Sequence, residues 1–137
     1  MKKFNSPLEA FLHWEQSSPN QIFLRQFHNG KTETLTFKQS GQEIRRIAQA
    51  IKKKNLRANS KIALLSKNCG HWVMADLAIM MSGHISVPIY PTLVAESIKP
   101  IIEHSESKLM IVGKLDDYES QKNAFSVTNH KEIWSDN

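Results

Sequence analysis

The residues of this 137-residue chain that could hold a phosphate group are its five glycines. Phosphate-binding loops need several glycines close together, because backbone amides must approach the anion where a helix begins. The smallest separation here is 11 residues, between Gly30 and Gly41; the others are Gly70, Gly83 and Gly113. Neither the dinucleotide-binding motif nor the P-loop motif can therefore be written from the sequence.

Nucleophilic or metal-binding chemistry would use the single cysteine, the histidines and the carboxylates. Cys69 and His71 lie two residues apart at a predicted helix start, so their side chains diverge and Cys69 is interpreted as a packed thiol. Asp116, Asp117 and Glu119 fall in a polar stretch typical of solvated carboxylates. No two histidines combine helical ligand spacing with a carboxylate: they are His13, His28, His71, His84, His104 and His130. We therefore assign no catalytic, cofactor-binding or metal-binding residue.

Two further groups of residues have competing interpretations. Lys52, Lys53, Lys54 and Arg57 could attract nucleic acid or acidic lipid, and the net charge is +5. They also fall in the last turn of a predicted helix, where cations offset the helix dipole, and no aromatic side chains are interleaved with them. We favour the structural role and expect no nucleic-acid binding. The second group could line an acyl pocket, but on a buried helix it is interpreted as core: Trp72, Met74, Met80 and Met81.

The elements that would position these residues begin with a helix and a hairpin. Ser6, Pro7 and Glu9 form a helix start, with a serine cap and a glutamate that can bond to the cap's amide. Segments 22–27 and 32–37 flank an Asn-Gly turn, which predicts a β-hairpin that pairs Leu24 with Leu35 and Ile22 with Phe37. One face of the hairpin should therefore be apolar.

The middle of the chain reads as strand, helix and strand. A capping box at Thr36 and Gln39 precedes an amphipathic helix that ends near Asn55. Segment 62–65 is a short apolar run typical of a strand covered on both faces, and 85–89 is the next strand. Between them, a helix capped by Asn68 runs to residue 82 and is apolar on nearly every side, which predicts a parallel βαβ unit.

The pattern continues to residue 113 and then fades. A helix over 95–103 should be kinked or shortened by Pro100, and 108–112 reads as a third strand. From Lys114 onward only Phe125, Val127, Ile133 and Trp134 interrupt a polar stretch. We expect an α/β fold, an N-terminal β-hairpin plus a parallel βαβ sheet with flanking helices. Residues 1–113 would form the N-terminal part of a domain and 114–137 a polar, truncated continuation.

Composition narrows the class of protein. Hydrophobic residues make up 40% of the chain and charged residues 23%, as in a globular domain or part of one. One cysteine excludes a disulfide framework and fits a reducing compartment. The chain shows no secretory signal and no apolar stretch of about 20 residues, so we expect a cytoplasmic protein, or one peripheral to a membrane.

Several short segments match, in order and spacing, the pattern of one enzyme superfamily. From about Leu35 to Gly113 the sequence resembles the N-terminal part of the AMP-forming adenylating enzymes, which include the acyl-CoA synthetases. Val87–Thr92 is most similar to the long-chain fatty acid branch. His71 in place of a glutamate, Asn59 in place of a glycine, and Pro100 depart from the pattern. The matching residues are Leu35–Phe37, Lys61–Leu65, Asn68, Trp72, Ala75, Ala78, Gly83, Val87–Thr92, Ile98, His104–Lys108 and Ile111–Gly113.

The resemblance implies a parent enzyme that joins a fatty acid to coenzyme A. ATP would activate the carboxylate as acyl-AMP, and the coenzyme A thiol would then displace AMP; ATP, Mg²⁺ and coenzyme A would serve the parent. The family's Ser/Thr/Gly-rich phosphate loop and its catalytic lysine have no counterpart here. We therefore expect an acid–thiol ligase fragment that is inactive alone.

The expected partners follow from the same resemblance. They are the remainder of the parent chain, a fatty acid as its substrate, and a second copy through an exposed apolar surface. The loop Tyr90–Leu93, at a strand's carboxyl end, is the segment expected to approach the substrate. Two alternatives stay open: a free-standing α/β interaction protein, and an electrostatic binder of nucleic acid or acidic lipid.

Overall fold

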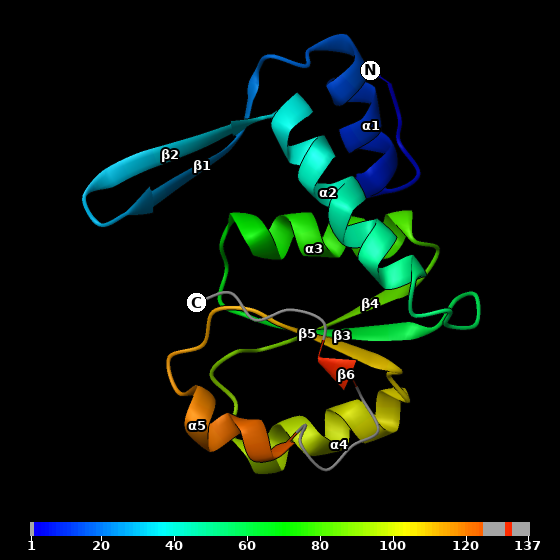
Figure 1. The fold of residues 1–137 in the computed structure, drawn as a ribbon, viewed down its shortest axis with the longest axis vertical. Helices are drawn as coiled ribbons and strands as arrows, with labels where there is room; N and C mark the ends of the chain where they lie inside the picture. The colour runs from blue at the N-terminus through cyan, green and yellow to red at the C-terminus, as the bar shows by residue number, and fades with distance from the viewer. Residues whose placement is uncertain (1, 125–130, 133–137) are drawn as a thin grey trace.

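The computed structural model describes residues 2–124 and 131–132 (Figure 1). Its elements, in chain order, are α1 (Pro7–Ser17), β1 (Ile22–His28), β2 (Lys31–Thr36), α2 (Phe37–Lys52), β3 (Lys61–Leu65), α3 (Gly70–Met81), β4 (Ile85–Ile89), α4 (Ala95–Ser105), β5 (Leu109–Val112), α5 (Tyr118–Gln121), the 3₁₀ turn η1 (Lys122–Ala124) and β6 (Lys131–Glu132).

A parallel sheet with the strand order β4-β3-β5-β6 forms the middle layer. Helices α2 and α3 cover one face, and α4 and α5 cover the other, so the sheet lies between two helical layers (Figure 1). Lys61 of β3 aligns with Ile85 of β4, and Ile62 aligns with Leu109 of β5. The parallel βαβ unit and the α/β fold are therefore confirmed.

Strand β3 contributes to a hydrophobic core on each face of the sheet. Ile62 and Leu64 belong to the core shared with α2 and α3, whereas Ala63 and Leu65 belong to the core shared with α4. All four side chains are at most 1% exposed. This two-sided burial explains why the strand is a continuous apolar run rather than an alternating one.

Helix α1 begins as the sequence predicts, with one difference. The Ser6 hydroxyl accepts a hydrogen bond from the Glu9 amide at 3.1 Å, and Pro7 is the first helical residue. The Glu9 carboxylate, however, accepts from the amide of Asn5 at 2.8 Å instead of from the cap residue itself. A carboxylate at this position still interacts favourably with the positive end of the helix dipole.

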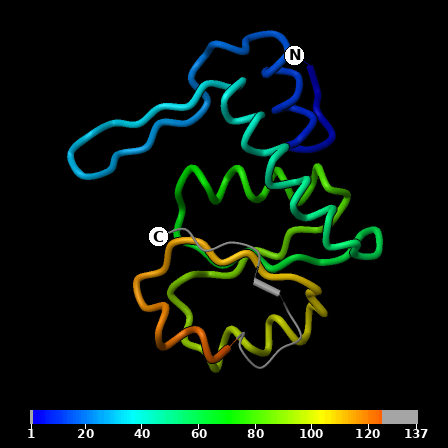
Figure 2. Tube along the Cα trace, in the orientation of Figure 1, coloured from blue at the N-terminus to red at the C-terminus, as the bar shows by residue number. Residues whose placement is uncertain are grey.

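The hairpin forms at the predicted turn, and one predicted pair is wrong. Asn29 and Gly30 both have positive φ values, 50° and 73°, and Leu24 pairs with Leu35. Ile22 pairs with Thr36 instead of Phe37, because the register shifts at Phe23. Thr36 is the cap of α2, so Phe37 is already helical. The hairpin projects away from the sheet (Figure 2).

The same register shift builds an aromatic cluster beneath the hairpin. The ring of Phe23 lies 5.0 Å from that of Phe11 and 4.8 Å from that of Phe37, measured between centroids. Through these rings α1, β1 and α2 pack together, and Phe23 and Phe37 lie against the core that contains Phe11. The packing of Phe23 against the two helices therefore favours a β-bulge at this residue over a regular cross-strand pair.

Three helix boundaries differ from the sequence prediction, the first being the end of α2, which lies at Lys52 and not near Asn55. Asn68 does not cap α3; the cap position is Cys69, whose side chain makes no capping hydrogen bond. Helix α4 runs through Pro100 to Ser105, two residues beyond the expected end, so the proline does not shorten it. Glu106, with a φ of 55°, ends that helix in the left-handed region.

The chain beyond Gly113 contains elements that the sequence analysis missed. Asp117 caps the short helix α5, and Ala124 of η1 is buried in the core on the α4 side. The apolar residues Phe125, Val127, Ile133 and Trp134 lie outside the described residues. The division at residue 113 remains a prediction.

Candidate functional site

The carboxyl ends of β3, β4 and β5 meet at one edge of the sheet, on the side toward which the hairpin projects (Figure 1). Open α/β sheets usually bind ligands at this edge. Three loops leave it: residues 66–69 after β3, 90–94 after β4 and 113–117 after β5. This edge is therefore the candidate functional site.

The loop after β4 exposes Tyr90 and is held from below. The Tyr90 side chain is 77% exposed. The Leu93 amide donates to the Tyr90 carbonyl at 3.3 Å, which closes a turn. Gln121, only 4% exposed, donates its Nε2 to the carbonyls of Pro91 at 2.7 Å and Leu93 at 2.8 Å. The loop backbone is therefore fixed while the tyrosine stays free to meet a ligand.

The loops after β3 and β5 are tied to each other. Buried Ser66 accepts a hydrogen bond at its hydroxyl from the Lys114 amide at 3.1 Å, and the Lys67 amide donates to the Lys114 carbonyl at 2.8 Å. Lys67 Nζ also forms an ion pair with Asp116 at 2.8 Å. This exposed pair contributes little to stability, whereas the buried Ser66 hydroxyl fixes the loop.

The candidate acids of the sequence analysis have structural roles. Asp116 pairs with Lys67, Asp117 accepts from the Ser120 amide at 3.4 Å as the cap of α5, and Glu119 pairs with Lys122 at 2.5 Å. That ion pair raises the pKa of Lys122, chiefly through the hydrogen bond to Glu119. These carboxylates are therefore engaged singly rather than gathered into one site.

The described residues do not form a metal site. Within ranges 2–124 and 131–132, no three His, Cys, Asp or Glu side chains converge on a point where a cation could bind. Cys69 is half-buried at the cap of α3, and Gly70 and Gly83 lie at opposite ends of that helix. We therefore assign no described residue to Mg²⁺, and the expected absence of residues that bind ATP or coenzyme A stays a prediction.

The predicted core helix and basic cluster lie where the sequence places them. Met74 is 1% exposed in the core, and Trp72 and Met81 pack against it. Met80 is half-buried. The cluster of Lys52, Lys53, Lys54 and Arg57 is exposed at the end of α2, and none of the four forms an ion pair with a described residue. The core interpretation of Met74 is confirmed, and the role of the basic cluster stays a prediction.

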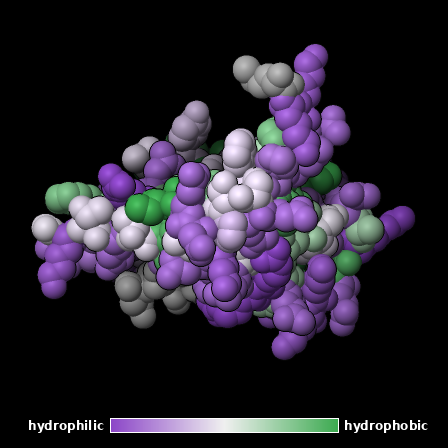
Figure 3. Space-filling view, turned by 90° about the horizontal axis from the view of Figure 1, so that it is seen from above, coloured by the Kyte–Doolittle hydropathy of each residue, from purple (hydrophilic) through white to green (hydrophobic). Residues whose placement is uncertain are grey.

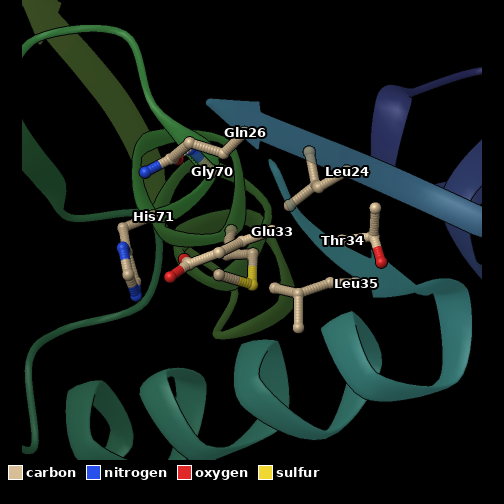
Figure 4. A pocket seen from close by; sticks show the side chains of 8 residues that line it. Leu24, Gln26, Glu33, Thr34, Leu35, Gly70 and His71 are labelled. Atoms are coloured by element: carbon tan, nitrogen blue, oxygen red, sulfur yellow. Dashed lines mark hydrogen bonds between the residues drawn. The ribbon is translucent and has the colours of Figure 1, made fainter. Parts of the chain in front are cut away.

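A pocket of about 450 Å³ lies between the hairpin and the start of α3 (Figure 4). Gln26 Oε1 accepts from the Gly70 amide at 2.7 Å across its wall, and Met74 forms part of its floor. The other lining residues are Leu24, Glu33, Thr34, Leu35 and His71. Sequence reasoning missed Gln26 and Gln121, because neither polar residue carries a local signal for a partner so far along the chain.

The comparison with protein families decides where this fold belongs. The family model described as AMP-binding enzyme matches residues 11–136 of this sequence. The chain belongs to the AMP-binding enzyme family. Within that family it is 24% identical over 96 residues to a long-chain-fatty-acid–CoA ligase of Mycobacterium bovis, covering 70% of this chain and 16% of that protein. It is 31% identical over 86 residues to fatty acyl-CoA synthetase A of Dictyostelium discoideum, covering 62% and 13%.

Solved structures of other ligases share the fold. Coronafacic acid ligase from Pectobacterium brasiliense superposes with a TM-score of 0.81 at 24% identity, over 94% of this chain and 25% of that one. A fatty acid AMP ligase from Legionella pneumophila gives 0.74 at 19% identity, over 96% and 24%. The chain thus spans about a quarter of the solved relatives and less than a fifth of the curated ones. Among the described residues, no helix is long and apolar enough to cross a bilayer.

Proposed function

We propose that this chain is the N-terminal scaffold of a longer ligase that activates a long-chain fatty acid with ATP and transfers it to coenzyme A. The observation that carries the proposal is the family match over residues 11–136, together with relatives named as long-chain fatty acid ligases. The parent enzyme would use Mg²⁺ with ATP, and those groups would be held by residues that this sequence does not contain.

In this proposal the chain builds one wall of the acyl site. The exposed Tyr90 stands on a backbone fixed by Gln121, at the sheet edge where ligands bind in related architectures. A rigid loop with an exposed aromatic ring can contact an acyl chain without the entropic cost of ordering itself. The chain's contribution is therefore to specificity rather than to the chemical step.

An activity assay of the isolated chain tests whether it acts only as a scaffold. Incubated with ATP, Mg²⁺, coenzyme A and a long-chain fatty acid, it should release no pyrophosphate. Reading the gene past the codon for Asn137 should then reveal a Ser/Thr/Gly-rich loop followed by a lysine. Pyrophosphate release by the isolated chain, or a natural stop codon after Asn137, would contradict the scaffold role.

Substitution of Tyr90 in the full-length ligase tests its contact with substrate. Tyr90→Ala should change the ratio of kcat/KM between short and long acyl chains, and Tyr90→Phe should keep the wild-type ratio. Phe27→Ala is a matched control, because Phe27 is also an aromatic residue 77% exposed but lies near the hairpin tip. An unchanged ratio in Tyr90→Ala would remove the loop from the acyl site.

We further propose that the protein is cytoplasmic or peripheral to a membrane. We also propose that the isolated chain self-associates through an exposed apolar surface. Viewed from the α1–α2 side, hydrophilic side chains predominate and hydrophobic atoms form separate patches (Figure 3). Exposed apolar side chains such as Ile22, Ile85 and Val94 are candidates for that contact. Light scattering should detect dimers or larger species, and a monomer at all concentrations would contradict this part of the proposal.

The basic cluster at the end of α2 is exposed and forms no ion pair with a described residue, which favours a second candidate function. Electrostatic binding of acidic lipid or nucleic acid would weaken steeply with added salt, since counterion release drives it. Co-sedimentation with anionic vesicles and titration with duplex DNA would measure this. Failure to bind either at low salt removes the candidate, and a specific protein partner together with no ligase continuation would favour a free-standing interaction protein.

A further inference from the structure

A second pocket, of about 310 Å³, lies between α1, α3 and the base of the hairpin. One residue of its lining is ionisable, namely Asp76 on α3. The other lining residues are apolar: Pro7, Ala10, Phe11, Trp14, Phe23, Phe37, Val73 and Leu77. Apolar pockets with few polar groups are the usual form of small-ligand sites, and this volume is at the small end of their range.

The aromatic part of the lining is held in place by its own contacts. The rings of Phe11, Phe23 and Phe37 all touch one another, with centroids 4.8 to 5.7 Å apart. Trp14 stands on α1 with 45% of its surface exposed, so part of the indole is open to solvent. Such a wall offers a ligand both apolar contact and aromatic faces, whose negative electrostatic potential attracts cations.

Asp76 lacks a partner in the described part of the chain. It lies in the middle of α3, half-buried, and it accepts no hydrogen bond and forms no ion pair with another described residue. A carboxylate beside apolar walls loses part of its hydration without compensation. A cation placed next to it would supply that compensation.

We propose that this pocket binds a hydrophobic organic cation, with an aromatic or aliphatic body among the phenylalanines and an ammonium group at Asp76. The proposal does not depend on the ligase function, because it rests on the charge and shape of this pocket alone. The small volume limits the ligand to about one ring with a short amine chain.

The probe that tests the proposal is phenethylamine, protonated at neutral pH, compared with 2-phenylethanol, which has the same body and no charge. Protein-observed NMR of the full 137-residue chain gives both affinities and locates the perturbed residues. The amine should bind about tenfold more tightly than the alcohol. That preference should fall as the salt concentration is raised from about 20 mM to about 500 mM.

Variants separate the charge from the cavity. Asp76→Asn should abolish the preference for the amine while leaving alcohol binding unchanged, and Ala10→Leu should weaken both by filling the pocket. Asp116→Asn is the matched control, since it removes a carboxylate at the sheet edge, away from this pocket, and should change neither affinity. If Asp76→Asn fails to fold, the salt dependence of the preference for the amine and the affinities measured with Ala10→Leu still test the proposal. Equal affinities for amine and alcohol, retained preference in Asp76→Asn, or shifts that map outside the pocket would overturn the proposal.

Discussion

The side-chain oxygen of Gln26, on hairpin strand β1, accepts a hydrogen bond from the backbone amide of Gly70 at 2.7 Å. That amide begins α3, whose cap residue Cys69 provides no side-chain acceptor. Gln26 thus serves as a helix cap supplied from 44 residues earlier in the chain. A Cβ at position 70 would lie 3.3 Å from the same oxygen, so the glycine leaves room for this cap.

Removing this cap should destabilise the protein. Gln26→Leu keeps a side chain of similar size but leaves the part-buried Gly70 amide without an acceptor, and the free energy of unfolding should fall by about 1 to 2 kcal/mol. Gln26→Glu keeps an acceptor and adds negative charge at the positive end of the helix, so it should be close to neutral. Urea unfolding measures both. Equal stability of Gln26→Leu and wild type would show that the hairpin does not cap α3.

Gly41 and Glu15 should show a strong energetic coupling. A Cβ at position 41 would lie 1.5 Å from Glu15 Oε2, whose carboxylate binds Arg45 in a fork at 2.7 and 2.5 Å. This hydrogen-bonded pair raises the pKa of Arg45. In the interior of a helix, Gly→Ala normally stabilises by about 1 kcal/mol where the new methyl group meets no clash. Here Gly41→Ala must displace Glu15, and that gain should be lost.

A double-mutant cycle with Glu15→Ala measures that coupling. In the Glu15→Ala background, Gly41→Ala should recover part of its stabilisation of about 1 kcal/mol, because the contact with Glu15 is gone and only the flexible end of Arg45, whose Nη1 would lie 2.8 Å from the new Cβ, has to move. Thermal or urea unfolding of the four proteins supplies the coupling free energy. Additive effects of the two substitutions would mean that the Glu15 carboxylate does not occupy the space beside Gly41.

Sequence reasoning succeeded where the signal is local or periodic. The apolar run at Ile62–Leu65 indicated a strand buried on both faces, and the Asn29-Gly30 pair indicated the hairpin turn. It failed where two local signals compete. The capping box at Thr36 ends β2 one residue before the predicted pair, and the strand opposite adjusts by a bulge at Phe23.

The candidate site was predicted only in outline. The placement of the Tyr90 loop at a carboxyl edge follows from the βαβ pattern, since such strands are parallel. The residue that holds the loop could not be predicted, because Gln121 lies in a four-residue helix of polar residues with no apolar periodicity. That Asp76 has no partner among the described residues is likewise invisible in sequence, where Asp76 looks like one polar interruption of a core helix.

Mild acid should weaken the fold through His84. Burial lowers the pKa of this imidazole, so the folded state binds its proton less readily than the unfolded state, whose pKa is about 6.5. Stability from this group is therefore present above about pH 6.5 and declines as the pH falls toward the folded pKa. The hydrogen bond from Arg46 lowers the pKa of Glu43 from its ordinary value of 4.5. Protonation of Glu43 therefore reduces the stability of the fold only below about pH 4.5, outside the range in which His84 acts.

Comparison of His84→Gln with wild type isolates this contribution. The urea midpoint of wild type should fall more between about pH 7.5 and about pH 5.5 than that of His84→Gln. His28→Gln is the matched control, because it removes an exposed histidine at the end of β1. Parallel pH profiles for wild type and His84→Gln would assign the acid sensitivity to other groups.

Loss of the Gln121 amide should release the loop after β4. Its Nε2 donates to the carbonyls of Pro91 and Leu93, whereas its Oε1 is buried with no hydrogen-bond partner in the described part of the chain. Gln121→Glu keeps the shape but replaces both donors with an acceptor that repels the two carbonyls, and Gln121→Met removes them without repulsion. Amide hydrogen exchange at Leu93, whose amide donates to the Tyr90 carbonyl, should accelerate in both variants, more in Gln121→Glu. Glu119→Gln, on the exposed side of α5, should leave this rate unchanged; if all three variants match wild type, Tyr90 is positioned by the turn alone and Gln121 only fills space.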